Sequence, residues 1–191
     1  MRILVIGASG TIGTAVTAAL RGRGHEVLAA SRRGRPSVDV ERPETVAPLL
    51  PGVAAVVCCA VSGGLTPVAE GEDAAFEQGL AGKLLGQVRL VRLAARLLPD
   101  GGSVTLTGGT FTAPLPGAAF GALVNAGLTA FVEAAAPELP RGLRVNVVSP
   151  GWVRETTGDQ GVPAAELALA YVRAVEEAGL TGRSLVVVGQ T

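Results

Sequence analysis

The residues best suited to bind a ligand form a glycine-rich turn near the start of the chain. Gly7, Gly10 and Gly13 are spaced three apart, between an apolar run and a segment with helical spacing. Glycine there permits a tight turn, close approach of the backbone to a pyrophosphate, and close packing of helix on strand. The first helical turn then offers free N–H groups to phosphate. A merely flexible turn is the weaker alternative. The contacts we expect are Gly7, Ser9, Gly10, Thr11, Ile12 and Gly13.

Basic residues follow the second apolar run, where an NAD site normally places an acidic residue on the adenosine ribose. The sequence there is Ser31-Arg32-Arg33. Arginine presents a rigid fork of donors that suits a phosphate group, so the pattern favours NADP(H) over NAD(H). The alternative is a solvated basic loop.

Composition limits the kinds of ligand. The chain has 191 residues, enough for one domain, and its 16 basic residues balance its 16 acidic ones. We therefore expect a small-molecule substrate, with no nucleic acid, membrane or metal as partner. We expect no apolar stretch long enough to span a bilayer and see no signal peptide, which favours a cytoplasmic location. Cys58 and Cys59 are predicted to be small buried residues.

Short apolar runs alternate with segments of helical spacing along the whole chain. This order predicts a single α/β domain, a Rossmann-like, doubly wound parallel sheet with helices on both faces, over residues 1–191. The expected strands are Ile3–Ile6, Glu26–Ala30, Val53–Cys59, Ser103–Leu106, Leu143–Val148 and Ser184–Val188, with a minor strand at Ser37–Val40. The expected helices are Ile12–Arg21, Pro43–Leu50, Asp73–Leu98, Ala118–Leu139 and Pro163–Ala178.

At this level the chain resembles the short-chain dehydrogenase/reductase family. The resemblance rests on the glycine turn and on three further segments: Val38-Asp39-Val40, Cys59-Ala60-Val61, and residues 144–151 with their Pro-Gly ending. It implies a strand order of 3-2-1-4-5-6-7 and a nicotinamide beside Pro150. The further cofactor contacts that it implies are Asp39, Val40, Cys59, Ala60, Val61, Asn125, Pro150, Gly151 and Val153.

The catalytic residues of that family are missing. The family uses Tyr and Lys four residues apart, with a Ser and an Asn. The corresponding positions here are Gly121, Asn125, Gly108 and Lys83. Tyr171 is the only tyrosine of the chain and Lys83 the only lysine, so no Tyr-x-x-x-Lys pair can exist in any register.

Three side chains remain as catalytic candidates. Lys83 could donate a proton, position the cofactor or simply be exposed. Thr107 and Thr110 flank Gly108 and could orient a substrate oxygen, although hydroxyl groups at strand ends more often bond nearby backbone. Tyr171 is expected in the core or at an interface.

Two functions fit these observations. One is an NADP(H)-dependent oxidoreductase that transfers a hydride to or from a small carbonyl or alcohol with an unusual proton donor. The other is an inactive NADP(H)-binding redox sensor that acts through a partner. Because residues 118–136 are apolar almost throughout, we expect a homodimer or homotetramer in which a second chain covers this helix.

Overall fold

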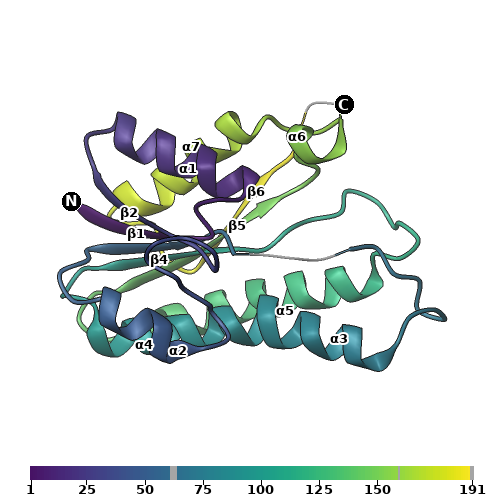
Figure 1. Ribbon diagram of the computed structural model, residues 1–191, viewed down its shortest axis with the longest axis horizontal. Helices are drawn as coiled ribbons and strands as arrows, with labels where there is room; N and C mark the ends of the chain where they lie inside the picture. The colour runs from purple at the N-terminus through teal and green to yellow at the C-terminus, as the bar shows by residue number, and fades with distance from the viewer. Residues whose placement is uncertain (61–63, 159, 190–191) are drawn as a thin grey trace.

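A parallel β-sheet forms the centre of the computed structural model, which describes residues 1–60, 64–158 and 160–189 (Figure 1). Within these residues the sheet has six strands in the order β2-β1-β3-β4-β5-β6, and every neighbouring pair is parallel. The carboxyl ends of parallel strands meet at one edge, where α/β proteins bind ligands. The strands are β1 (Arg2–Ile6), β2 (Glu26–Ala30), β3 (Ala55–Cys58), β4 (Ser103–Thr107), β5 (Arg144–Pro150) and β6 (Arg183–Val187).

Helices cover both faces of this sheet, as the alternating pattern predicts (Figure 1). Successive strand residues point to opposite faces, so Leu4 belongs to one apolar core and Val5 to the other. One face packs on α1 (Thr11–Gly22) and α7 (Ala164–Glu176), with the short α6 (Arg154–Thr157) nearby. The other packs on α2 (Pro43–Val46), α4 (Gln87–Leu97) and α5 (Ala119–Ala135). The doubly wound α/β fold is therefore confirmed.

The predicted minor strand at Ser37–Val40 is not formed. Only one parallel bridge, between Ser31 and Ser37, links this segment to the end of β2. The Val38 N–H still donates to the Ser31 carbonyl at 3.1 Å, but the chain then turns away, because the Arg42 N–H donates to the Asp39 carbonyl and the Asp39 N–H to the Thr45 hydroxyl, both at 3.0 Å. The sheet therefore lacks the expected outermost strand, while the order of the other six strands is as predicted.

The long helix predicted over Asp73–Leu98 is interrupted. It consists of α3 (Asp73–Gly79), the π-helical turn η2 (Leu80–Gly86) and α4. Glycines mark the interruption because they let other elements approach closely: a Cβ on Gly86 would lie 3.0 Å from the Val40 side chain, and one on Gly79 would lie 2.8 Å from the Phe120 ring. Lys83 lies within this π-helical turn.

The helix α5 carries most of the apolar stretch found in the sequence. Residues Ala119–Glu138 are long and apolar enough, by length and composition alone, to cross a membrane, so the expectation that no stretch reaches that length was wrong. Here the stretch packs on the sheet through Val124, Leu128 and Val132. Because only 22% of its most apolar window is buried, much of its apolar surface faces outward.

Candidate functional site

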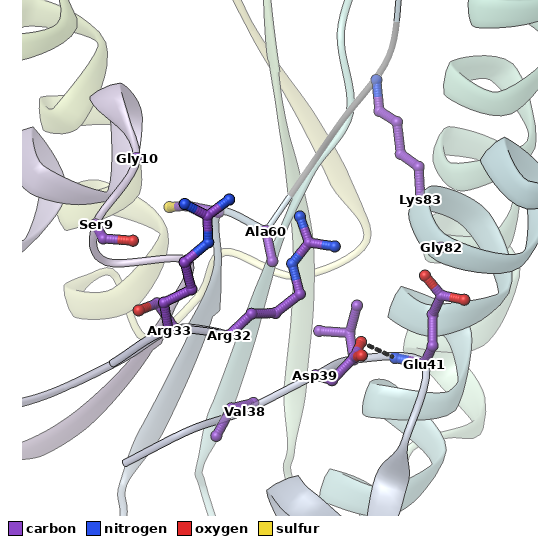
Figure 2. Close-up of a pocket in the computed structure, with 14 residues that line it drawn as sticks. Ser9, Gly10, Arg32, Arg33, Val38, Asp39, Glu41, Ala60, Gly82 and Lys83 are labelled. Carbon is purple, nitrogen blue, oxygen red and sulfur yellow. Dashed lines mark hydrogen bonds between the residues drawn. The ribbon is translucent and has the colours of Figure 1, made fainter. Parts of the chain in front are cut away.

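The glycine turn forms one side of a groove of about 270 Å³ at the carboxyl edge of the sheet (Figure 2). Gly7 has a φ of +82°, and a Cβ there would lie 2.6 Å from the Ala60 backbone nitrogen. A Cβ on Gly13 would overlap the Gly7 carbonyl. Glycine at these two positions therefore lets β1, β3 and α1 come together. Gly13 acts through this packing, whereas Gly7, Ser9 and Gly10 line the groove.

The amino end of α1 opens onto the same groove. Gly10 precedes the helix in an extended conformation, and no side chain caps the first turn. The first N–H groups of a helix lack acceptors within it and carry partial positive charge. Because α1 has no acidic residue in its first turn, these donors remain suited to a phosphate group.

The far end of the groove is basic. Ser31, Arg32 and Arg33 line it, and both guanidinium groups project into it (Figure 2). In the ranges that the structure describes, neither arginine belongs to an ion pair. The Asp39 carboxylate is already engaged, since it accepts a hydrogen bond from the Glu41 N–H at 3.1 Å and pairs with Arg42 at 3.5 Å. The two guanidinium groups are therefore free to bind an anion.

A second cavity, of about 540 Å³, continues from this groove. Gly10, Cys59 and Lys83 line both, so the two spaces meet at these residues. Of the predicted contacts, the groove contains Gly7, Ser9, Gly10, Ser31, Arg32, Arg33, Asp39, Val40, Cys59 and Ala60. The cavity contains Thr11, Ile12, Asn125, Pro150, Gly151 and Val153. Val61 lies outside the described residues.

Lys83 extends from η2 into the junction of the two spaces (Figure 2). Its side chain is partly buried, and this desolvation lowers the pKa of the amine. Glu41 also lines the groove, and its carboxylate would lie 3.0 Å from a Cβ on Gly82, the residue before Lys83. Of the candidates from the sequence, Lys83 is the one whose position and chemistry both suit proton transfer or cofactor positioning.

Asn125 lies in the wall of the cavity and carries a buried polar atom without a partner among the described residues. The residue is 7% exposed, and its Oδ1 has no hydrogen-bond partner among the described residues. A Cβ on Gly109 would lie 2.9 Å from the Asn125 Nδ2, so this glycine leaves the space that the carboxamide needs. An unpaired buried acceptor destabilises the fold. A ligand hydroxyl or N–H reaching Oδ1 would remove that cost.

Thr107 must be removed from the catalytic candidates. It is fully buried, and its Oγ1 donates to the Cys58 carbonyl at 2.6 Å. The same oxygen lies 2.7 Å from the Tyr171 hydroxyl, which is fully buried on α7. Because Thr107 points to the face of the sheet that α7 covers, it cannot reach the cavity. Tyr171 is a core residue, and burial raises its pKa well above the usual value.

Gly108 and Gly121, which stand at the positions of the family's Ser and Tyr, line the cavity, as does the candidate Thr110. Thr110 is partly buried there, beside Gly108 and Gly121. A Cβ on Gly121 would lie 3.3 Å from the Phe111 ring, which fills the space a side chain at 121 would take. Phe111 also meets Trp152 edge to face, with ring centroids 6.2 Å apart. Sequence patterns did not identify Phe111, because nothing local links it to Gly121.

Both cysteines are free and buried at the end of β3. Burial raises the pKa of Cys58 to about 12 and also raises that of Cys59. At neutral pH both are therefore thiols, which are poor nucleophiles. The edge of Cys59 contributes to the cavity wall as an apolar surface.

These features fit a phosphorylated dinucleotide. The glycine cradle has no room for a Cβ, the open end of α1 and two unpaired guanidinium groups suit phosphates, and a buried acceptor on Asn125 has no partner among the described residues. The fold and the site together define a dinucleotide-binding protein of the Rossmann type.

Comparisons with known proteins agree with this class. A family model described as enoyl-(acyl carrier protein) reductase matches residues 38–184. Protein lin1944 from Listeria innocua is 36% identical, with a TM-score of 0.90, 97% of this chain covered and 98% of that one. A small-chain dehydrogenase is 26% identical, with a TM-score of 0.85 and coverages of 98% and 95%. The chain belongs to the short-chain dehydrogenase/reductase family of oxidoreductases.

A further likeness concerns the fold alone. Another small-chain dehydrogenase, crystallised in complex with NADPH, is 23% identical, with a TM-score of 0.86 and coverages of 98% and 96%. A comparison with curated protein sequences gave no match.

Proposed function

We propose that the protein is an NADP(H)-dependent oxidoreductase acting on a small carbonyl compound or alcohol. The observation that carries the proposal is one continuous site. It joins the glycine turn, two arginines without an ion pair among the described residues, and a cavity that opens beside Pro150 and Gly151. The structural relative crystallised with NADPH supports the choice of cofactor.

The chain's own residues would divide the work of binding. Arg32 and Arg33 bind the 2′-phosphate, and the first turn of α1 binds the pyrophosphate. Asn125 accepts a hydrogen bond from a ribose hydroxyl or the carboxamide. When bound, the nicotinamide supplies or takes up the hydride, so the protein needs mainly to hold a substrate against it.

Proton transfer falls to Lys83 in this proposal. Its depressed pKa brings the amine closer to the range in which it can give and take protons. Thr110, which also lines the cavity, can donate a hydrogen bond to the substrate oxygen. Loss of the family's tyrosine would lower the rate by about 10²–10⁴-fold where no other group replaces it.

The cavity walls narrow the choice of substrate. Lys83 is the one charged side chain among the described residues that line it, and Phe111, Trp152 and Leu65 supply apolar surface. Such a lining suits a neutral or anionic molecule with an apolar or aromatic body. It disfavours cations, because none of the described residues on these walls carries a carboxylate to balance their charge.

The direct test is titration calorimetry with NADPH and with NADH, followed by nicotinamide absorbance against carbonyl, quinone and enoyl compounds. We expect tighter binding of NADPH and turnover with at least one apolar acceptor. Equal binding of the two nucleotides would contradict the cofactor assignment, and absence of binding would contradict the proposal as a whole.

The second candidate is a catalytically inactive NADP(H)-binding sensor. The observation that favours it is the replacement of the family's Ser and Tyr by Gly108 and Gly121, which leave no hydroxyl at either position. Tight NADPH binding with no turnover across the panel, and with Lys83→Met unchanged in affinity, would favour the sensor.

We also propose that the protein is a homodimer, assembled through α4 and α5. The outward-facing apolar residues of these helices include Leu97 and Leu123, with 40% and 59% of their surface exposed. Burying such residues against the same surface of a second chain would remove them from water.

A further inference from the structure

Gln87, the first residue of α4, is a fully buried polar side chain that no sequence motif explains. Its carboxamide makes three hydrogen bonds. Nε2 donates to the Lys83 carbonyl at 2.8 Å and to the Thr107 carbonyl at 3.0 Å, while Oε1 accepts from the Thr107 N–H at 2.9 Å. One side chain therefore joins the π-helical turn η2 to the end of β4.

The bond to Lys83 replaces one that an α-helix would make with its backbone. In α-helical register the Lys83 carbonyl would accept the Gln87 N–H. In η2 that N–H donates to the Leu84 carbonyl instead, and the Gln87 side chain takes its place. A side chain inserted into the helix ladder in this way is a known cause of local irregularity.

The bonds to Thr107 extend the sheet by one step. The pairing of β3 with β4 ends at Val57 and Thr105, so the backbone N–H and carbonyl of Thr107 do not pair with β3. The Gln87 carboxamide bonds both the N–H and the carbonyl of Thr107, as a neighbouring strand would. Because the backbone of Thr107 is also paired with Val148 of the buried strand β5, the anchor is rigid and does not depend on the Thr107 hydroxyl.

The π-helical turn η2 is rich in glycine and needs an anchor to keep one conformation. Gly79, Gly82 and Gly86 surround Lys83, and glycine adds backbone freedom and weakens helices. Without a tether, η2 would sample several registers, each placing the Lys83 amine differently. The groove and the cavity meet at Lys83, so its placement affects both.

We propose that Gln87 is a positioning residue of this site, whose side chain fixes η2 against β4 and thereby holds the Lys83 amine at the junction of the groove and the cavity. The inference rests on the proposed function at one point, the expectation that a bound cofactor faces Lys83. Gln87 itself touches neither cavity, since its bonds go to the backbone.

The single lysine makes the test direct. Lysine labelled with ¹³C at Cε gives one side-chain resonance, whose titration reports on Lys83 alone, without cofactor or substrate. Gln87→Met keeps the size of the side chain and removes all three hydrogen bonds. We expect the titration midpoint of Lys83 to rise toward the ordinary lysine value, because the released amine becomes better solvated. The charged neighbours Arg32, Arg33 and Glu41 are unchanged in this variant.

Thr107→Val is the matched control. It removes the hydroxyl bonds to Cys58 and Tyr171 and so weakens the core, but it keeps the backbone groups that Gln87 binds. Its Lys83 midpoint should equal that of the wild type. An unchanged midpoint in folded Gln87→Met, or an equal rise in Thr107→Val, would overturn the proposal.

A second variant covers the case in which Gln87→Met does not fold. Gln87→Glu, as a carboxylate, keeps an acceptor for the Thr107 N–H but loses the donors to the Lys83 and Thr107 carbonyls. Amide hydrogen exchange over residues 80–86 should then become faster, relative to α7 in the same molecule. Unchanged exchange would reject the role of Gln87. Since these measurements use the protein without nucleotide, their failure is distinguishable from failure to bind NADP(H).

Discussion

The preference for NADPH over NADH should depend on Arg32 and Arg33 and should fall stepwise when they are removed. Charge-assisted hydrogen bonds contribute about 1.5–3 kcal/mol each. Both side chains are exposed, so the lower end of that range applies to each. A loss of about 1.5 kcal/mol is roughly a tenfold rise in Kd.

We therefore expect Arg32→Ala and Arg33→Ala each to weaken NADPH binding about tenfold, and the double variant about 100-fold if the two effects add. NADH binding should barely change, because it has no 2′-phosphate. Titration calorimetry with both nucleotides at two salt concentrations gives the comparison, and the wild-type preference should shrink at high salt.

Arg21→Ala is the charge-matched control, since it removes one exposed positive charge at the far end of α1. It should leave both affinities unchanged. The reasoning is refuted if the Arg32 and Arg33 variants weaken NADPH and NADH equally, or if Arg21→Ala lowers NADPH affinity as much as they do.

Three further changes test other parts of the site and the assembly. Asn125→Leu should change the free energy of unfolding by less than about 1 kcal/mol, because Oδ1 has no partner to lose among the described residues. The same variant should bind NADPH more weakly; urea unfolding measures the first effect and calorimetry the second. Lys83→Met should stabilise the fold at neutral pH, and urea midpoints should show this gain shrinking as the pH rises toward 10.5, the ordinary lysine pKa. Leu123→Glu should convert a dimer into monomers in light scattering, since it places a charge on an exposed apolar face of α5.

The sign of the Lys83 effect follows from its lowered pKa. Between the folded-state pKa and 10.5 the unfolded chain binds the proton and the folded chain does not, so stability rises with pH through that window. Below the window the buried charge destabilises the fold fully. A gain in Lys83→Met that grows with pH would contradict this assignment.

The other two predictions can also fail. A wild-type protein that is a monomer, or a Leu123→Glu variant that remains a dimer, would contradict the proposed assembly. Strong destabilisation by Asn125→Leu would show that Oδ1 has a partner.

The sequence predicted the groove well because its parts are local. The glycine turn and Ser31-Arg32-Arg33 each follow a strand directly, and parallel strands bring their carboxyl ends to one edge. The same rule places Pro150, the last residue of β5, in the adjoining cavity. Fixing the strands was therefore enough to bring these residues to the same side of the molecule.

Two features of the site were not predicted, for different reasons. Strand parity decides where Thr107 points: Leu106 belongs to the core under α4 and α5, so its neighbour must face α7. That signal was available in the sequence. The π-helical turn was not, because its anchor joins Gln87 to a residue 20 positions away.

The buried cysteine pair has a consequence for how the fold can be observed. Burial raises the pKa of Cys58 to about 12 and also raises that of Cys59, so the folded chain should react very slowly with thiol reagents at neutral pH. Modification of Cys58, which is fully buried, then requires the end of β3 to leave the core. The rate at which a thiol reagent labels Cys58 therefore measures how often the central sheet opens. A bound nucleotide that rests on Cys59 and Ala60 should slow it.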